Sequence, residues 1–134
     1  MKTRNIMFFT LLIIGIWNLS AQTLTVRIEN IDVGKGHVMV GVFNEERNFP
    51  DNAPFIGKTE IASDMVIVST FTNLPVGQYA VAVYQDNNSN GQLDTNIFGI
   101  PMEKYGFSNN TRVPNFRRCL FHFNGDMTIA IQIK

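Results

Sequence analysis

The chain has 134 residues with 11 basic and 11 acidic side chains, so its formal net charge is zero. This balance, without a basic stripe, argues against nucleic acid as a partner, and the length suits one domain with a substantial core. The single cysteine, Cys119, leaves no internal disulfide, so stability must come from apolar packing, with a bound metal as a further source.

Residues 1–21 have the pattern of a secretory signal peptide. Lys2 and Arg4 precede an apolar run at positions 6–17, and Ala21 supplies a small residue at the cleavage position. A membrane-spanning helix needs about 20 apolar residues, more than this run contains. We therefore expect cleavage after residue 21, a mature domain of residues 22–134 without a membrane span, and export to the periplasm or the medium.

Strand patterns dominate residues 22–134. Apolar and polar residues alternate at 24–29, 78–83 and 128–134, while 37–43 is apolar on both faces and 65–71 is rich in β-branched residues. No segment carries a convincing helical stripe. These features predict an all-β fold, a single antiparallel β-sandwich of about seven strands, immunoglobulin-like or prealbumin-like.

The connections suit such a sandwich. Residues 44–57 form a long loop with Pro50 and Pro54, and Leu74-Pro75-Val76-Gly77 predicts a tight turn. The segment 71–81, FTNLPVGQYAV, resembles a turn found in many prealbumin-like and immunoglobulin-like domains, where leucine and tyrosine pack at a sheet corner. This resemblance concerns the fold and implies no activity.

The segment 86–94, DNNSNGQLD, has the spacing of a loop folded around a hard cation. Its oxygen-bearing side chains recur at every second position, a glycine follows at the sixth place, and Leu93 is expected to anchor the loop in the core. The expected ion is calcium rather than magnesium, because magnesium prefers to keep its waters. The predicted metal ligands are Asp86, Asn88, Asn90, Gln92 (through its carbonyl) and Asp94.

One part of an EF-hand-type loop is missing. The twelfth place, usually a bidentate glutamate, is Ile97, and Asn96 or Glu103 would have to substitute. We therefore expect weak binding, with a Kd on the order of 10⁻⁴ to 10⁻³ M. The alternative interpretation is a polar hairpin loop that needs no metal, because Asn-Gly and Asx-turn chemistry also explains the composition of residues 87–91.

The run 86–109, DNNSNGQLDTNIFGIPMEKYGFSN, resembles the hallmark of a family of exported bacterial proteins, domain of unknown function 2141. Leu74, Pro75, Gly77, Tyr79 and the strand at 36–42 also fit, so the resemblance covers most of residues 22–134. It implies a small secreted β-sandwich and no assigned activity. Many members have a histidine before the first aspartate. Here that position is Gln85, which puts a histidine ligand in doubt.

Polar and aromatic residues beside the loop predict a rim for a sugar or peptide ligand. These residues are Glu103, Tyr105, Phe107, Ser108 and Asn109. The alternative is that the aromatic residues close one end of the sandwich and that Ser108 and Asn109 cap backbone groups, since aromatic side chains are commonly buried.

No catalytic residue is assigned from the sequence. Cys119 and His122 are three apart in a predicted strand and so point to opposite faces, and Cys119 is expected to be a buried thiol on the face of Phe121 and Phe123. The hypothesis is a non-enzymatic accessory or binding module with a calcium-type loop. The alternative is a small glycan-acting hydrolase that uses the acidic residues of segment 86–103.

Overall fold

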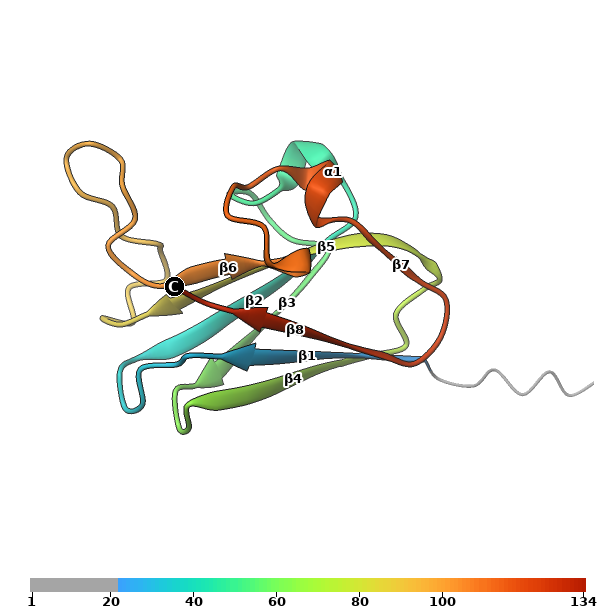
Figure 1. The fold of residues 1–134 in the computed structure, drawn as a ribbon, viewed down its shortest axis with the longest axis horizontal. Coiled ribbons are helices and arrows are strands. Elements are labelled where there is room, and N and C mark those ends of the chain that lie inside the picture. The colour runs from blue at the N-terminus through green and yellow to red at the C-terminus, as the bar shows by residue number, and fades with distance from the viewer. Residues whose placement is uncertain (1–21) are drawn as a thin grey trace, which may run out of the picture.

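The computed structural model describes residues 22–134, and the predicted signal peptide lies outside them (Figure 1). The strands and the single α-helix are β1 (Thr23–Glu29), β2 (His37–Phe43), β3 (Ile56–Ile61), β4 (Val66–Thr72), β5 (Gly77–Asp86), β6 (Tyr105–Phe107), α1 (Phe116–Cys119), β7 (Phe121–Phe123) and β8 (Met127–Gln132). Two short 3-10 helices span Glu46–Asn48 and Ser108–Asn110.

The strands form two sheets that face each other, which confirms the predicted all-β sandwich. One sheet has the order β4-β1-β8, and the other has the order β3-β2-β5-β6, with β7 also pairing with β5. The described residues contain eight strands where about seven were expected. Within residues 22–134 there is no helix long and apolar enough to cross a bilayer.

The pairing is antiparallel except between β1 and β8, which run parallel. This is a correction to the wholly antiparallel prediction. The short turn between β7 and β8 lies at the end of the sandwich where β1 begins. β1 and β8 therefore leave that end in the same direction (Figure 1). At this end the Asp126 carboxylate accepts a 2.7 Å hydrogen bond from the Thr23 backbone N–H. This bond holds the first residues of β1 and β8 side by side.

The core lies between the sheets and follows the predicted alternation. β1 contributes Leu24, Val26 and Ile28, all fully buried, while the intervening Arg27 faces solvent. Burying each such aliphatic side chain contributes about 1.5–3 kcal/mol. Within the described residues the buried clusters extend from position 24 to position 133, so we expect residues 22–134 to hold a core sufficient for folding.

The turn before β5 has the predicted corner geometry. The Tyr79 hydroxyl donates a 2.6 Å hydrogen bond to the Pro75 carbonyl, and the Tyr79 ring packs edge-on against Phe123. Leu74 is buried beside them. Burial of Tyr79 raises the pKa of its hydroxyl.

Cys119 is buried as predicted, but it does not lie in a strand. It ends α1, whose first turn is capped by the Asn115 side chain, which accepts a 3.1 Å hydrogen bond from the Arg118 N–H. The strand begins only at Phe121, so the predicted common face of Cys119, Phe121 and Phe123 is wrong. Burial raises the pKa of the Cys119 thiol.

Gly36, in the turn between β1 and β2, lies directly against the end of β5. Its φ is +60°, and an added Cβ would lie 1.9 Å from the backbone oxygen of Asp86. Gly34 in the same turn has φ +79° and open space around it. The two glycines therefore separate the cost of backbone strain from the cost of a steric clash.

We predict that Gly34→Ala lowers the free energy of unfolding by about 1 kcal/mol, the cost of a left-handed backbone with a side chain. Gly36→Ala adds overpacking of about 1–3 kcal/mol to that strain, so it should lower stability by about 3 kcal/mol. Urea unfolding of both variants measures this. Equal losses would show that the turn does not pack tightly on β5.

Candidate functional site

The predicted cation loop connects β5 to β6 and projects from one end of the sandwich (Figure 1). Asp86, the last residue of β5, is only 2% exposed. Its Oδ1 accepts from the Asn90 N–H at 3.1 Å, and its Oδ2 accepts from the Gly91 N–H at 2.7 Å. Gly91 has a φ of +78°, which turns the chain so that both N–H groups point back to the carboxylate.

Asn88, Asn90 and Asp94 come together at the outer side of the loop. The Nδ2 atoms of Asn88 and Asn90 donate to the Asp94 carboxylate at 2.6 and 2.8 Å. Each asparagine Oδ1 also accepts from the backbone N–H two residues further on, which is an Asx turn. Gln92 joins this network only through its backbone N–H, which donates to Asn90.

Glu103 lies inside the loop, where the predicted rim would have placed it at a surface. It is 7% exposed, and its Oε1 and Oε2 accept from the Asn87 and Asp94 N–H groups at 2.8 and 3.0 Å. One carboxylate therefore joins the beginning and the end of the loop. Asn96 is similarly engaged, because its Oδ1 accepts from the Phe98 and Ile100 N–H groups.

The loop carries negative charge without a basic partner in the described part of the chain. Asp86, Asp94 and Glu103 take part in none of the ion pairs found within residues 22–134. Burial, Asp86 and Glu103 together raise the pKa of the neighbouring Tyr84. Within residues 22–134 no three Asp, Glu, His or Cys side chains form a metal-binding cluster. Any ion held in the loop would therefore also need asparagine oxygens.

Three neighbouring side chains hold the loop on the sandwich. The His37 Nδ1 and the Ser89 Oγ are 2.9 Å apart, and the Tyr84 hydroxyl donates to the Gly91 carbonyl at 3.0 Å. At the other end of the loop the Lys104 ammonium contacts the Asp32 carboxylate at 2.7 Å. Because Lys104 lowers the pKa of Asp32, this pair contributes stability above about pH 4 that is lost as the pH falls through the lowered pKa.

Gln85 faces away from the loop, toward the interior of the sandwich. Its amide donates to the carbonyls of Asp32 and Lys35 at 2.8 and 2.7 Å, and its Oε1 accepts from the Asp32 N–H at 2.9 Å. Adjacent residues of a strand point to opposite faces, so a side chain at position 85 is directed away from Asp86. In this chain, position 85 supports the β1–β2 turn.

The remaining residues of the predicted ligand rim divide into two groups. Ser108 and Asn109 bind backbone groups. The Ser108 Oγ accepts from the Val81 N–H and donates to the Cys119 carbonyl, and the Asn109 amide donates to the carbonyls of Arg118 and Leu120 at the end of α1. Tyr105 and Phe107 lie on β6 and line a surface hollow. Only this aromatic pair is therefore placed to meet a ligand.

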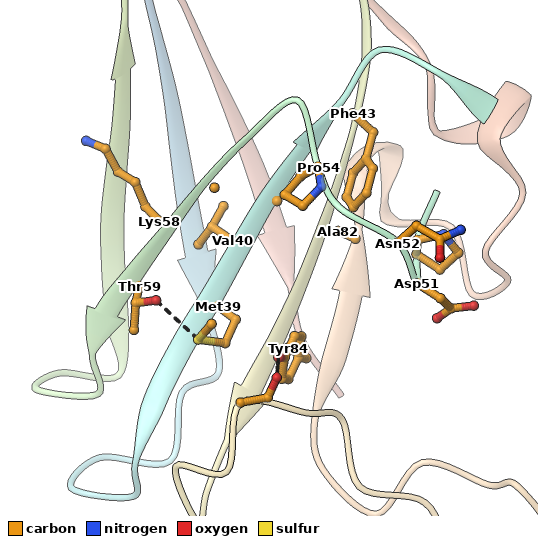
Figure 2. Close-up of a pocket in the computed structure, with 14 residues that line it drawn as sticks. Met39, Val40, Phe43, Asp51, Asn52, Pro54, Lys58, Thr59, Ala82 and Tyr84 are labelled. Atoms are coloured by element: carbon orange, nitrogen blue, oxygen red, sulfur yellow. Dashed lines mark hydrogen bonds between the residues drawn. The ribbon is translucent and has the colours of Figure 1, made fainter. Parts of the chain in front are cut away.

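Two adjoining hollows lie on the outer face of the larger sheet, and Figure 2 shows the residues that line the first. They enclose about 380 and 370 Å³. Residues that line both are Pro50, Asp51, Ala82, Tyr84 and Gly91. We call the two together the sheet groove. Its walls are the loop at 50–54 and residues 91–93 of the predicted cation loop.

The sheet groove follows from side-chain size in two cross-strand rows. The first row, with two glycines and an alanine, is Gly57, Gly41, Ala82 and Phe107. The second row is Thr59, Met39, Tyr84 and Tyr105. Phe43 and Pro54 lie over the two glycines, and the depression opens beside them at Ala82, which lines both hollows. The signal in the sequence was Gly41 and Gly57 within strands, where glycine often marks close approach of a ligand or another backbone.

Leu93 was predicted to anchor the loop in the core, but it does not reach the core. It is half-buried and lines the sheet groove beside Tyr84 and Gln92. The loop is anchored instead by polar groups, chiefly the carboxylates of Asp86 and Glu103.

Fold and site define the class: a small two-sheet β-sandwich with an asparagine-rich loop between β5 and β6. The chain belongs to the family domain of unknown function 2141, described as an uncharacterised protein conserved in bacteria, whose family model matches residues 26–131. This confirms the resemblance seen in residues 86–109. No curated protein and no solved structure matches the chain.

We predict that Glu103→Gln lowers the free energy of unfolding by about 2 kcal/mol, because one of the two charge-assisted, partly buried hydrogen bonds to backbone N–H groups is lost. Glu46→Gln is the control, since that side chain is 64% exposed, and should stay within about 0.5 kcal/mol. Urea unfolding measures both, and amide exchange at Asn87 and Asp94 should accelerate only in Glu103→Gln. Matching effects of the two variants would contradict the bridging role.

Proposed function

We propose that the protein is an exported, non-enzymatic binding module that holds a calcium ion in loop 86–94 and a sugar or short peptide in the sheet groove. The main support for a bound calcium ion is the negative charge of the loop. Asp86 and Glu103 are buried carboxylates, the Asp94 N–H donates to Glu103, and none of the three has a basic partner within residues 22–134. Buried charges are normally paired or bound to metals.

The donor geometry supports this proposal. Asn88 and Asn90 present their amide nitrogens to Asp94, and rotating each amide would present oxygen instead. This rotation gives up the two Asx-turn hydrogen bonds, and the contacts with the ion would have to compensate for them. Asp86, Asn88, Asn90 and Asp94, together with the Gln92 carbonyl and water, would supply the six to eight oxygens that calcium prefers.

We predict that calcium binds chelator-treated residues 22–134 with a Kd on the order of 10⁻⁴ to 10⁻³ M and raises the melting temperature. Asp94→Asn removes one negative charge with little change of shape and should weaken binding at least tenfold. Asp64→Asn, in the β3–β4 turn, should bind as the unmodified chain does. Isothermal titration calorimetry measures the affinities. The ion proposal fails if millimolar calcium produces neither heat nor a thermal shift.

The runner-up, a glycan-acting hydrolase, requires a carboxyl group that can donate a proton. Both oxygens of Asp86 and both oxygens of Glu103 accept backbone N–H groups, so each carboxylate is already engaged in holding the loop. Neither residue lines the sheet groove. These contacts support structural roles for the two carboxylates and therefore a binding module.

The chemistry of the sheet groove suits a ligand with one apolar face and several polar groups. Met39, Tyr84 and Tyr105 offer an apolar and aromatic floor, and the polar side chains at its edges are Asp51, Asn52, Thr59 and Gln92. Pockets of this kind combine apolar contact with a few placed polar groups. The Tyr84 hydroxyl binds Gly91 of the cation loop, so an ion that orders the loop would also order one wall of the groove.

We predict that Ala82→Leu, which fills the shared centre of the sheet groove, abolishes ligand binding while changing stability by less than about 1.5 kcal/mol. The unmodified chain is screened against glycan and peptide arrays, and each hit is titrated against the variant. Val68→Leu, on the exposed outer face of β4, is the matched control and should retain every hit. Ligands that still bind the Ala82→Leu variant, or arrays without any hit, would contradict the proposal that the sheet groove is the ligand site.

A further inference from the structure

Beyond the cation loop the chain forms a short hairpin with an apolar tip. Thr95 and Pro101 form an isolated bridge, and the Met102 N–H donates to the Asp94 carbonyl at 2.8 Å. Its large apolar side chains are almost fully solvent-exposed: Ile97 at 94%, Phe98 at 78%, Met102 at 71% and Ile100 at 58%. In Figure 1 this segment is the loop that extends furthest from the sheets at the upper left. We call residues 95–102 the apolar hairpin.

An ordered, hydrogen-bonded turn keeps these side chains exposed. The Asn96 Oδ1 accepts from the Phe98 and Ile100 N–H groups at 2.9 and 3.0 Å. The Asn96 and Gly99 N–H groups donate within the turn at 2.9 Å each. The turn therefore holds Ile97 and Phe98 outward, where they cannot fold back on the sandwich.

The same hydrogen bonds lower the cost of moving the hairpin into an apolar medium. Five of the seven backbone N–H groups of residues 95–102 have acceptors, namely those of Asn96, Phe98, Gly99, Ile100 and Met102, whereas those of Thr95 and Ile97 have none within the described residues. Unsatisfied backbone groups are what normally bars a loop from hydrocarbon. Residues 95–102 also contain no charged side chain. A hairpin that served only as a solvated connection would need neither property.

We propose that the apolar hairpin inserts into the surface of a phospholipid bilayer. A stable protein dimer buries about 800 Å² on each partner, contributed by about 20–30 residues, and four side chains on a projecting tip cannot supply such an area. A bilayer surface accepts a few apolar side chains to a depth of about 5–10 Å. Contact through one hairpin gives weak, reversible attachment.

The proposal does not rest on the ion. The apolar hairpin is closed by its own hydrogen bonds and is uncharged, so attachment is expected with calcium and with chelator. Failure of the calcium proposal and failure of the lipid proposal are therefore distinguishable in the same experiment.

The test uses residues 22–134, which contain no tryptophan, because the single tryptophan of the chain is Trp17. Phe98→Trp places a fluorescent reporter at the tip of the apolar hairpin. Val76→Trp places one at the β4–β5 turn, which is 59% exposed and lies at the opposite end of the sandwich. With vesicles of zwitterionic phosphatidylcholine, which do not repel the acidic loop, Phe98→Trp should shift its emission to the blue and be quenched by brominated lipid, whereas Val76→Trp should do neither.

Vesicle flotation of the chain with its own residues provides a second readout. The double variant Ile97→Ser/Phe98→Ser should partition at least tenfold less than the unmodified chain, with unchanged circular dichroism. No flotation of the unmodified chain, or equal responses of the two tryptophan reporters, would overturn the proposal. Concentration-dependent dimers in sedimentation velocity that disappear in the double variant, without vesicle binding, would overturn it in favour of a second copy as the occupant.

Discussion

The structure around the β5–β6 connection depends on buried carboxylates that accept backbone N–H groups. Glu103 joins Asn87 to Asp94, and Asp86 binds the N–H groups of Asn90 and Gly91. A long loop at the end of a small sandwich has many backbone groups to satisfy and little apolar surface to bury, and here side-chain oxygens supply the order that a core supplies elsewhere. The consequence is an accumulation of negative charge, which makes the loop a place for a cation.

The loop connects three parts of the molecule. Its first half carries the oxygen donors, its middle forms a wall of the sheet groove, and its second half presents the apolar hairpin. Tyr84 links the first two, because its ring lies in the groove and its hydroxyl binds Gly91. Asp94 links the first and third, because its side chain receives the asparagine amides and its carbonyl closes the hairpin. Short covalent and hydrogen-bonded connections therefore join the three parts.

The sandwich could be predicted from the sequence because strand alternation is a local pattern, as in β1, where every second residue is buried. The parallel pairing of β1 with β8 could not, since it depends on which end of the sandwich the distant β7–β8 turn occupies. Cys119 was misplaced because three aromatic or apolar neighbours resemble a strand, while one asparagine cap was enough to start a helical turn. The meeting of Asn88, Asn90 and Asp94 was expected from spacing within one loop, whereas the Asp86 side chain binds backbone N–H groups of Asn90 and Gly91. The inward position of Glu103 and the small-residue row beneath the sheet groove involve register between separate strands and segments, which no local pattern reports.

The central claim is that the side chains now bonded to one another across loop 86–94 exchange their amide donors for a cation. A crystal structure of residues 22–134 grown with millimolar calcium tests this most directly. The account predicts spherical density about 2.3–2.6 Å from oxygens of Asp86, Asn88, Asn90 and Asp94, with the asparagine amides rotated to present oxygen. Asparagine nitrogens that still donate to Asp94, with no density between the four side chains, would contradict it.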